Sequence, residues 1–160
     1  MPEASIRFRH EKCEKPSRGN ANPLTPASGR YLLDTNILIA ILDGEKSALS
    51  SLKMAAGVYV PAVALGELYY GAAKSGRPAE NAAKVNRFAA DATILPCDLG
   101  VARECGLVKQ CLREKGRPIP ENDIRIAAMA KHYGLVLVTR EGHFEAVEGL
   151  VTVDWAGAAS

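Results

Sequence analysis

Residues 30–39 read RYLLDTNILI, in which a short, largely apolar segment ends in an acid and a second apolar run follows. This pattern predicts a short buried strand that ends at Asp34 and a helix that begins at once, at Thr35. In open α/β sheets, binding and catalytic sites form outside the carboxyl ends of the strands, and Asp34 has such a position. Aspartate also caps helices well, so the alternative that Asp34 only caps this helix stays open.

The length and composition indicate one globular domain. The chain has 160 residues, of which 48% are hydrophobic, and its mean hydropathy is −0.04; these values suit a single domain with its own core. The apolar runs are too short to span a bilayer, and the N-terminus lacks the apolar segment of a signal peptide. We therefore expect a cytoplasmic protein that does not act on a membrane.

The cysteines give no sign of a metal site. Their spacing fits neither a zinc pattern nor a tight redox pair. We expect free thiols, as is usual in a reducing compartment, at all four positions: Cys13, Cys97, Cys105 and Cys111.

Charge is balanced over most of the sequence. Of 20 basic and 18 acidic residues, five and three lie in residues 1–29, so residues 30–160 carry 15 of each sign. A neutral domain does not bind nucleic acid through bulk charge alone. A polyanionic ligand would need a local basic patch or bound metal ions.

Residues 1–29 lack hydrophobic periodicity and carry four prolines, at positions 2, 16, 23 and 26. Such a segment buries too little apolar surface to offset its ordering entropy, so we expect a disordered N-terminal extension. A weak phosphate-binding arm is the functional alternative for its basic residues. The folded domain is expected over residues 30–155, followed by a short C-terminal tail at 156–160.

From residue 30 the sequence alternates between strand-like and helix-like segments. After the first strand, further strands are expected at 58–61, 93–95, 135–139 and 151–153. Helices are expected at 35–42, 47–56, 62–74, 78–91, 99–115 and 121–133, and a loop at 140–144. The predicted fold class is therefore α/β, a single domain with a central, mostly parallel sheet flanked by helices on both faces.

Four acids lie where the ends of these elements can meet. Asp34 and Glu141 follow strands, Glu67 lies in the helix after the second strand, and Asp123 lies in the first turn of a later helix. Each acid alone could be solvated, and Asp123 could simply complement the helix dipole. Together, carboxylates within about 4–6 Å raise one another's pKa and favour bound cations. Their hard oxygens suit Mg²⁺ or Mn²⁺.

Such a site suits the hydrolysis of phosphodiesters. Divalent ions can activate water and neutralise the leaving oxygen, so no Ser, Cys or His nucleophile is required. The chain lacks a glycine-rich phosphate loop of the Walker type, which argues against a nucleotide triphosphatase. A phosphatase is a weaker alternative, because no Asp-x-Asp pair follows the first strand.

Four short motifs carry these acids in the order and spacing of a known family. They are residues 33–39 (LDTNILI), 66–71 (GELYYG), 119–128 (IPENDIRIAA) and 137–144 (LVTREGHF). The motifs resemble those of PIN-domain ribonucleases, in particular the VapC-type toxins of bacterial toxin–antitoxin pairs. The resemblance covers about residues 30–155, and the first and third motifs together are its most specific part.

The resemblance implies a Mg²⁺- or Mn²⁺-dependent endoribonuclease that acts as the toxin of a type II toxin–antitoxin system. Asp34, Glu67 and Asp123 are similar to the three core acids that bind the metal and carry catalysis in that family. Glu141 is a fourth catalytic and metal-binding candidate, at a position where the family usually has Asp. Its extra methylene moves the carboxylate, and Mg²⁺ tolerates little error around its octahedron, so Glu141 could ligate directly, through water or not at all.

Several neighbours of the acids are also candidates. Thr35 and Asn36 look like groups that orient the acids from behind. His143 is expected to pack near Phe144 rather than to act as a general base. Four basic residues are candidates for holding RNA phosphates, with a solvated basic face as the alternative: Lys115, Arg117, Arg125 and Arg140.

The resemblance also implies partners, namely an RNA substrate, a cognate antitoxin that occludes the site, and a second copy of the chain in a homodimer. Apolar and aromatic residues crowd residues 65–70, which an intramolecular core explains equally well. Two alternatives keep the fold and change the function. One is a housekeeping RNA-processing nuclease with no antitoxin, and the other is a catalytically silent PIN-fold binding module in which Glu141 marks decay of the site.

Overall fold

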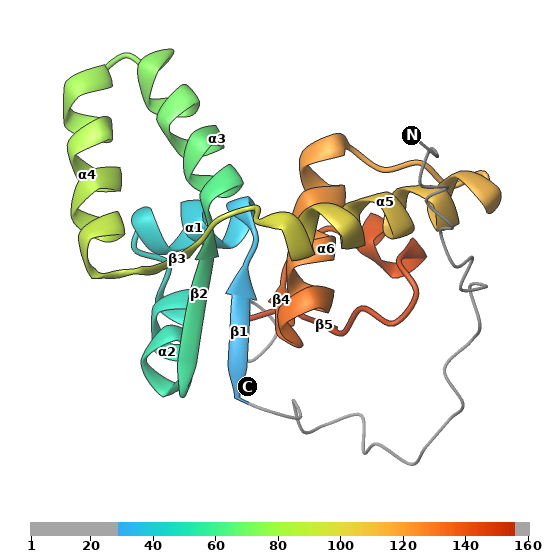
Figure 1. Ribbon diagram of the computed structural model, residues 1–160. Coiled ribbons are helices and arrows are strands. Elements are labelled where there is room, and N and C mark those ends of the chain that lie inside the picture. The colour runs from blue at the N-terminus through green and yellow to red at the C-terminus, as the bar shows by residue number, and fades with distance from the viewer. Residues whose placement is uncertain (1–28, 156–160) are drawn as a thin grey trace, which may run out of the picture.

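A five-stranded sheet organises residues 29–155, the part of the chain that the computed structural model describes. Within this range each strand runs parallel to its neighbours, in the order β3-β2-β1-β4-β5 (Figure 1). The strands are β1 (Arg30–Leu33), β2 (Gly57–Pro61), β3 (Thr93–Leu95), β4 (Val136–Val138) and β5 (Thr152–Val153).

Helices fill the connections between the strands. They are α1 (Thr35–Leu42), α2 (Lys46–Met54), α3 (Ala62–Ala73), α4 (Pro78–Asp91), α5 (Leu99–Glu114) and α6 (Glu121–Tyr133), with a 3-10 helix, η1 (Gly142–Ala146). Helix α1 packs on α2 and α3, α3 packs on α4, and α5 packs along α6. The α3–α4 hairpin stands beyond the carboxyl end of β2 (Figure 1).

The strand order reverses direction at the pair β1 and β4. The chain runs outward from β1 through β2 to β3 and then crosses back over the sheet to β4. Because crossovers between parallel strands are right-handed, the helices before and after this reversal cover opposite faces of the sheet. The loops that leave β1 and β4 therefore diverge, and a crevice forms at the carboxyl ends of these two strands.

The two central strands position the residues that follow them. Leu33 and Val138 are both 0% exposed, as expected for strands covered on both faces. They are register partners, and the backbone N–H of Asp34 continues the pairing by donating to the carbonyl of Val138 at 3.0 Å. This pairing places Asp34 beside Thr139 at the end of the sheet.

The predicted α/β fold class is confirmed, and most element boundaries agree with the sequence-based ranges. Helices α1, α4 and α6 cover the expected residues. Helix α2 begins and ends earlier than predicted, because the chain must be extended before Gly57, where β2 starts. Residues 142–144, expected to belong to a loop, form the start of η1.

Three further expectations concern single features. Within the described residues, no helix combines the length and apolar character that a bilayer crossing requires. Cys97 and Cys105 are free thiols, but Cys111 is disulfide-bonded, so the expectation of free thiols is wrong at that position. The predicted disordered extension, except Gly29, and the tail at 156–160 lie outside the described residues.

Candidate active site

Four acids from separate parts of the chain line one pocket of about 640 Å³, which we call the acid pocket. Asp34 follows β1, Glu67 lies on α3, Asp123 lies in the first turn of α6, and Glu141 follows β4. The pocket thus lies at the carboxyl ends of the two central strands, where the strand order reverses. All four acids predicted from the sequence are brought together there.

Asp34 is the most deeply buried of these acids, at 3% exposed. One of its carboxylate oxygens accepts from the backbone N–H of Thr35 at 2.7 Å. The other accepts from the hydroxyl of Thr139 at 2.7 Å and from the side-chain amide of Asn36 at 3.1 Å. Asp34 therefore caps α1 and also lines the acid pocket, so the two functions considered for it coexist.

The surroundings of Asp34 make its ionised form costly. Burial is the main cause that raises the pKa of Asp34 above its ordinary value of 3.8, and repulsion from Asp123 and Glu141 raises it further. The hydrogen bonds from Thr139 and Thr35 act in the opposite direction. Retention of an unfavourable buried carboxylate is typical of a site built to bind a cation or to perform chemistry.

Asp123 is held by a histidine. Its carboxylate lies 2.7 Å from His143 Nε2. Burial raises the pKa of Asp123 above 3.8, the contact with His143 lowers it, and repulsion from Glu67 and Glu141 raises it. The predicted packing of His143 near Phe144 is confirmed, since their ring centroids are 4.8 Å apart. The contact between His143 and Asp123 was not predicted from the sequence.

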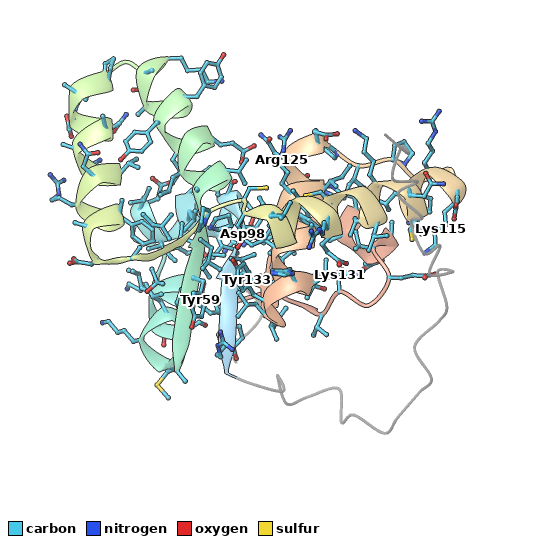
Figure 2. The ribbon with its side chains drawn as sticks, viewed as in Figure 1. Tyr59, Asp98, Lys115, Arg125, Lys131 and Tyr133 are labelled. Carbon is cyan, nitrogen blue, oxygen red and sulfur yellow. The ribbon has the colours of Figure 1, made fainter. Side chains whose placement is uncertain are left out.

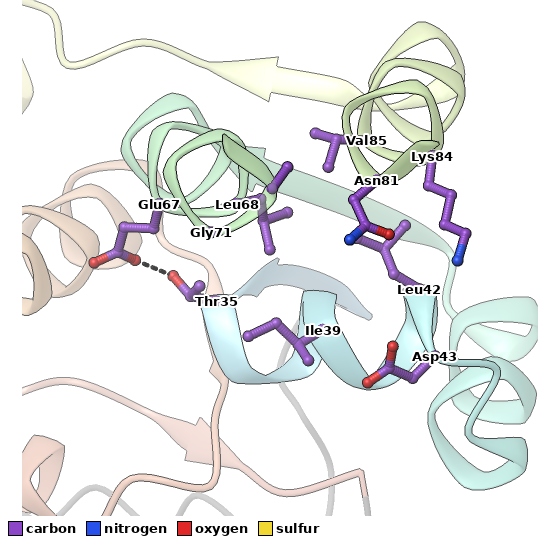
Figure 3. A pocket seen from close by; sticks show the side chains of 11 residues that line it. Thr35, Ile39, Leu42, Asp43, Glu67, Leu68, Gly71, Asn81, Lys84 and Val85 are labelled. Carbon is purple, nitrogen blue, oxygen red and sulfur yellow. Dashed lines mark hydrogen bonds between the residues drawn. The ribbon is translucent and has the colours of Figure 1, made fainter. Parts of the chain in front are cut away.

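Glu67 is fixed through both of its carboxylate oxygens. One accepts from the hydroxyl of Thr35 (Figure 3), and the other accepts from the side-chain amide of Asn122 at 2.9 Å. The amide oxygen of Asn122 in turn accepts from the guanidinium of Arg125 at 2.7 Å. Arg125 thus supports Glu67 through Asn122, which differs from the phosphate-binding function predicted for it.

Glu141 is the most exposed of the four acids, with 52% of its side chain accessible. Its carboxylate lies 3.8 Å from His143 Nδ1, and its backbone N–H donates to the hydroxyl of Thr139 at 3.0 Å. Glu141 therefore contributes negative charge at the rim of the acid pocket, where water competes for its oxygens.

Sequence reasoning missed three residues that hold the acids: Asn122, Thr139 and His143. Thr139 is the first polar residue after a buried apolar strand, which is the same signal that drew attention to Asp34. Asn122 immediately precedes Asp123 at the start of α6. His143 had no local signal, because its contact with Asp123 depends on how η1 folds back toward α6.

A family comparison agrees with this geometry. The model of the PIN domain family matches residues 31–150. The protein belongs to the PIN-domain family. The first motif that suggested this family covers the end of β1 and the start of α1, and the second lies within α3. The third covers the start of α6, and the fourth covers the end of β4 and the start of η1.

Within the PIN-domain family, the chain is similar to proteins and solved structures that carry the names VapC and VapBC. It is 40% identical over 129 residues to "Ribonuclease VapC2" of Haemophilus influenzae, with 79% of this chain and 98% of the relative covered. It is 35% identical over 134 residues to the "tRNA(fMet)-specific endonuclease VapC" of Shigella flexneri, with the same coverage. A DNA-bound VapBC structure from Salmonella typhimurium superposes with a TM-score of 0.75 at 31% identity, covering 79% of this chain and 98% of that one.

The basic residues predicted to hold RNA do not line the acid pocket of this PIN domain. Arg140 pairs with Glu45, and Lys115 pairs with Glu148 at 2.6 Å, while Arg117 is exposed. Figure 2 shows Lys115 at the distal end of α5, away from Arg125. The pocket is instead lined by Lys74, whose ammonium lies 4.7 Å from the ring centroid of Tyr70.

The donor set of this PIN domain suits a hard divalent cation. Within residues 29–155, no three Asp, Glu, His or Cys side chains are grouped closely enough to form a ready-made metal site. Asn36 also lines the acid pocket, and its buried side-chain oxygen has no hydrogen-bond partner among the residues that the structure describes. Carboxylate and amide oxygens together are the ligands that Mg²⁺ and Mn²⁺ prefer.

Proposed function

We propose that this PIN domain is a divalent-metal-dependent endoribonuclease that acts as the toxin of a toxin–antitoxin pair. The convergence of Asp34, Glu67, Asp123 and Glu141 on one pocket carries the proposal. The relatives at 40% and 35% identity, named a ribonuclease and a tRNA endonuclease, support the hydrolysis of RNA.

Mg²⁺ or Mn²⁺ would be held by Asp34, Glu67 and Asp123, with Glu141 as a fourth ligand. When bound, the ion supplies a Lewis acid for the scissile phosphate and an activated water for its hydrolysis. Because the pKa values of Asp34 and Asp123 are raised, protons compete with the cation for both carboxylates.

Three polar residues in or next to the acid pocket position these acids. The hydroxyl of Thr139 orients Asp34, the imidazole of His143 orients Asp123, and the amide of Asn122 orients Glu67. Groups of this kind fix the direction of a ligand oxygen, and their loss commonly lowers metal affinity by about 10–100-fold.

An antitoxin protein and a second copy of the chain are the proposed partners, in the cytoplasm. A solved relative at 28% identity, VapBC-5 of Mycobacterium tuberculosis, is described as a member of a family of toxin-antitoxin systems, with a TM-score of 0.65. On α3, Leu65 and Leu68 are buried in the core, whereas Tyr69 and Tyr70 are exposed at 39% and 68%. The exposed tyrosines are available for contact with a partner.

The test is cleavage of RNA with and without Mn²⁺ by the parent protein and by Asp34→Asn. We expect metal-dependent cleavage that Asp34→Asn removes, because the neutral amide cannot replace an anionic ligand. Asp91→Asn is the matched control, since Asp91 is exposed at the end of α4 and does not line the acid pocket. Undiminished cleavage by Asp34→Asn would rule out the proposed function.

A catalytically silent PIN-fold module is the second candidate, favoured by the exposure of Glu141 and by the lack of a ready-made three-acid grouping among the described residues. Thermal unfolding with increasing Mn²⁺ separates the two. The nuclease is expected to gain stability with Mn²⁺, and Asp34→Asn is expected to abolish the gain. A silent module would not respond to Mn²⁺ in either form.

A further inference from the structure

A second cavity, which we call the side pocket, adjoins the acid pocket. It has a volume of about 260 Å³ and lies between α1, α3 and α4 (Figure 3). Thr35, Ile39, Glu67 and Gly71 line both cavities. A ligand that enters the acid pocket can therefore extend into the side pocket between α1 and α3.

The side pocket has an apolar middle and a polar far end. Its walls are aliphatic, formed by Ile39, Leu42, Leu68 and Val85. Figure 3 shows three polar side chains gathered at the end opposite Thr35 and Glu67: Asp43, Asn81 and Lys84. The cavity thus presents apolar walls next to the acids and hydrogen-bonding groups beyond them.

The polar end offers both acceptors and donors. The carboxylate of Asp43 has no hydrogen bond or ion pair with any residue that the structure describes. The amide of Asn81 is fixed by donating to the hydroxyl of Ser75 at 2.9 Å. The ammonium of Lys84 lies 4.0 Å from Glu80, a distance that leaves its donor capacity largely unused.

From these features we propose that the side pocket binds one nucleobase of an RNA strand whose phosphodiester lies in the acid pocket, and that guanine is the base it fits best. The inference rests on the nuclease function proposed above. The side pocket, at about 260 Å³, is smaller than the pockets of about 300–1,000 Å³ that bind drug-sized ligands. This size suits a single base. Unstacked bases are bound between apolar side chains and read by hydrogen bonds to their Watson–Crick edge.

The combination of Asp43 and Lys84 selects guanine by its hydrogen-bonding edge. Guanine presents two adjacent N–H donors, which a carboxylate can accept together, and a carbonyl oxygen, which an ammonium can contact. Adenine and cytosine place a ring acceptor beside their amino group, and uracil places its single N–H between two carbonyls. Each of these bases would therefore turn an acceptor toward the carboxylate of Asp43.

A protein side chain is a less suitable occupant. An apolar side chain would fill the aliphatic walls, but it would cover Asp43 and Lys84 without giving either a partner. Covering a charged group without a hydrogen bond costs free energy. A nucleobase can pack against the aliphatic walls and also form hydrogen bonds with Asp43 and Lys84.

The experiment measures cleavage, with Mn²⁺, of single-stranded oligoribonucleotides that differ in one base at a time near the cut. We expect a preference for guanine at one position of about tenfold, the scale of a good bidentate contact to a base. Asp43→Asn is expected to lose this preference and to accept xanthine, whose second carbonyl can receive the new amide N–H. Asp91→Asn, outside both pockets, is expected to keep the preference for guanine.

A pair of glycine variants on α3 tests the connection between the pockets. A Cβ atom at Gly66 or at Gly71 meets nothing within 4 Å, so both sites accept a larger side chain. Gly71 lines both pockets and Gly66 lines neither. Gly71→Leu is expected to lower guanine cleavage to the level of the other bases, whereas Gly66→Leu is expected to behave as the parent.

Binding measurements keep the inference separate from the proposed function. Asp34→Asn protein is titrated with fluorescent oligoribonucleotides, and base preference is read from anisotropy without any cleavage. Loss of guanine preference when Asp43→Asn is added supports the inference even if the parent cleaves no RNA, a result that would overturn the proposed function alone. Equal binding of all four bases, or a preference unchanged by Asp43→Asn and Gly71→Leu, overturns the inference and leaves the side pocket to a protein partner.

Discussion

The two ends of the acid pocket differ in how firmly their acids are held. At the β1 end, Asp34 is 3% exposed and accepts hydrogen bonds from Thr35, Asn36 and Thr139. At the β4 end, 52% of the Glu141 side chain is accessible. Strand pairing continues as far as the backbone of Asp34, whereas Glu141 lies in the segment leading to η1. Asp34 is therefore held both by the end of the sheet and by its side-chain partners, whereas the carboxylate of Glu141 extends into solvent.

The largest expected difference is in cleavage rate. Asp34→Asn is expected to lower the rate by a hundredfold or more, on the order of losing one preorganised charge at a transition state. Glu141→Gln is expected to lower it by less than about tenfold, because an exposed carboxylate is partly replaced by water. Initial rates at saturating Mn²⁺ give the comparison, and equal losses would show that both ends hold their acids alike.

Thr139 joins the two ends and offers a second test. Its hydroxyl donates to Asp34 at 2.7 Å and accepts from the backbone N–H of Glu141 at 3.0 Å. Thr139→Val is expected to reduce the free energy of unfolding by about 1–3 kcal/mol, since the buried carboxylate of Asp34 and the part-buried N–H of Glu141 each lose a hydrogen bond. Mn²⁺ affinity is expected to fall by about 10–100-fold.

Urea unfolding and Mn²⁺ titration measure these effects. Thr93→Val is the matched control, because Thr93 is exposed on β3 and does not line the acid pocket. If Thr139→Val matched this control in both measurements, the hydroxyl would not be what orients Asp34.

The buried end should also respond to pH. Because burial raises the pKa of Asp34 above 3.8, its contribution to stability is present below that pH and is lost as pH rises through the higher folded-state pKa. In metal-free buffer, we expect the parent to lose stability relative to Asp34→Asn as the pH rises from below 3.8 through the folded-state pKa of Asp34. Denaturant unfolding at a series of pH values measures the free energy of unfolding of both proteins. If the parent became more stable relative to Asp34→Asn as the pH rose, burial would not be raising the pKa of Asp34.

The smallest expected effect is at the exposed end. Glu141→Asp is expected to give equal or slightly higher cleavage, because 52% of the Glu141 side chain is accessible and a shift of its carboxylate meets little resistance from neighbours. Glu145→Asp, at an exposed position of η1, serves as the control for shortening an acid nearby. A large loss with Glu141→Asp alone would show that the rim of the pocket has adapted to glutamate, and the cleavage assay detects it.

The residues predictable from sequence are those whose placement is local. Asp34 follows an apolar strand and precedes a helix, so its position at the end of the sheet follows from the pattern of residues 30–39. Asp123 was found in the same way, from a proline-bounded helix start at residues 118–123. In both cases a single boundary between elements determines where the carboxylate lies.

Contacts between distant elements were not predictable. His143 reaches Asp123 only because η1 folds toward α6, and Arg140 pairs with Glu45 across 95 positions. The side pocket depends on the angle at which α4 packs against α1 and α3, which no periodicity reveals. Packing geometry, rather than residue type, decides these features.

The pairing of β1 with β4 has a consequence for the newly made chain. Asp34 and Thr139 are 105 positions apart, and contacts of such separation form only after the intervening chain is available. A polypeptide whose translation stops before residue 136 has neither β4 nor the hydroxyl that orients Asp34. Unfinished products of the ribosome therefore contain the first acid but no assembled pocket, and whatever activity the pocket has begins only near the end of synthesis.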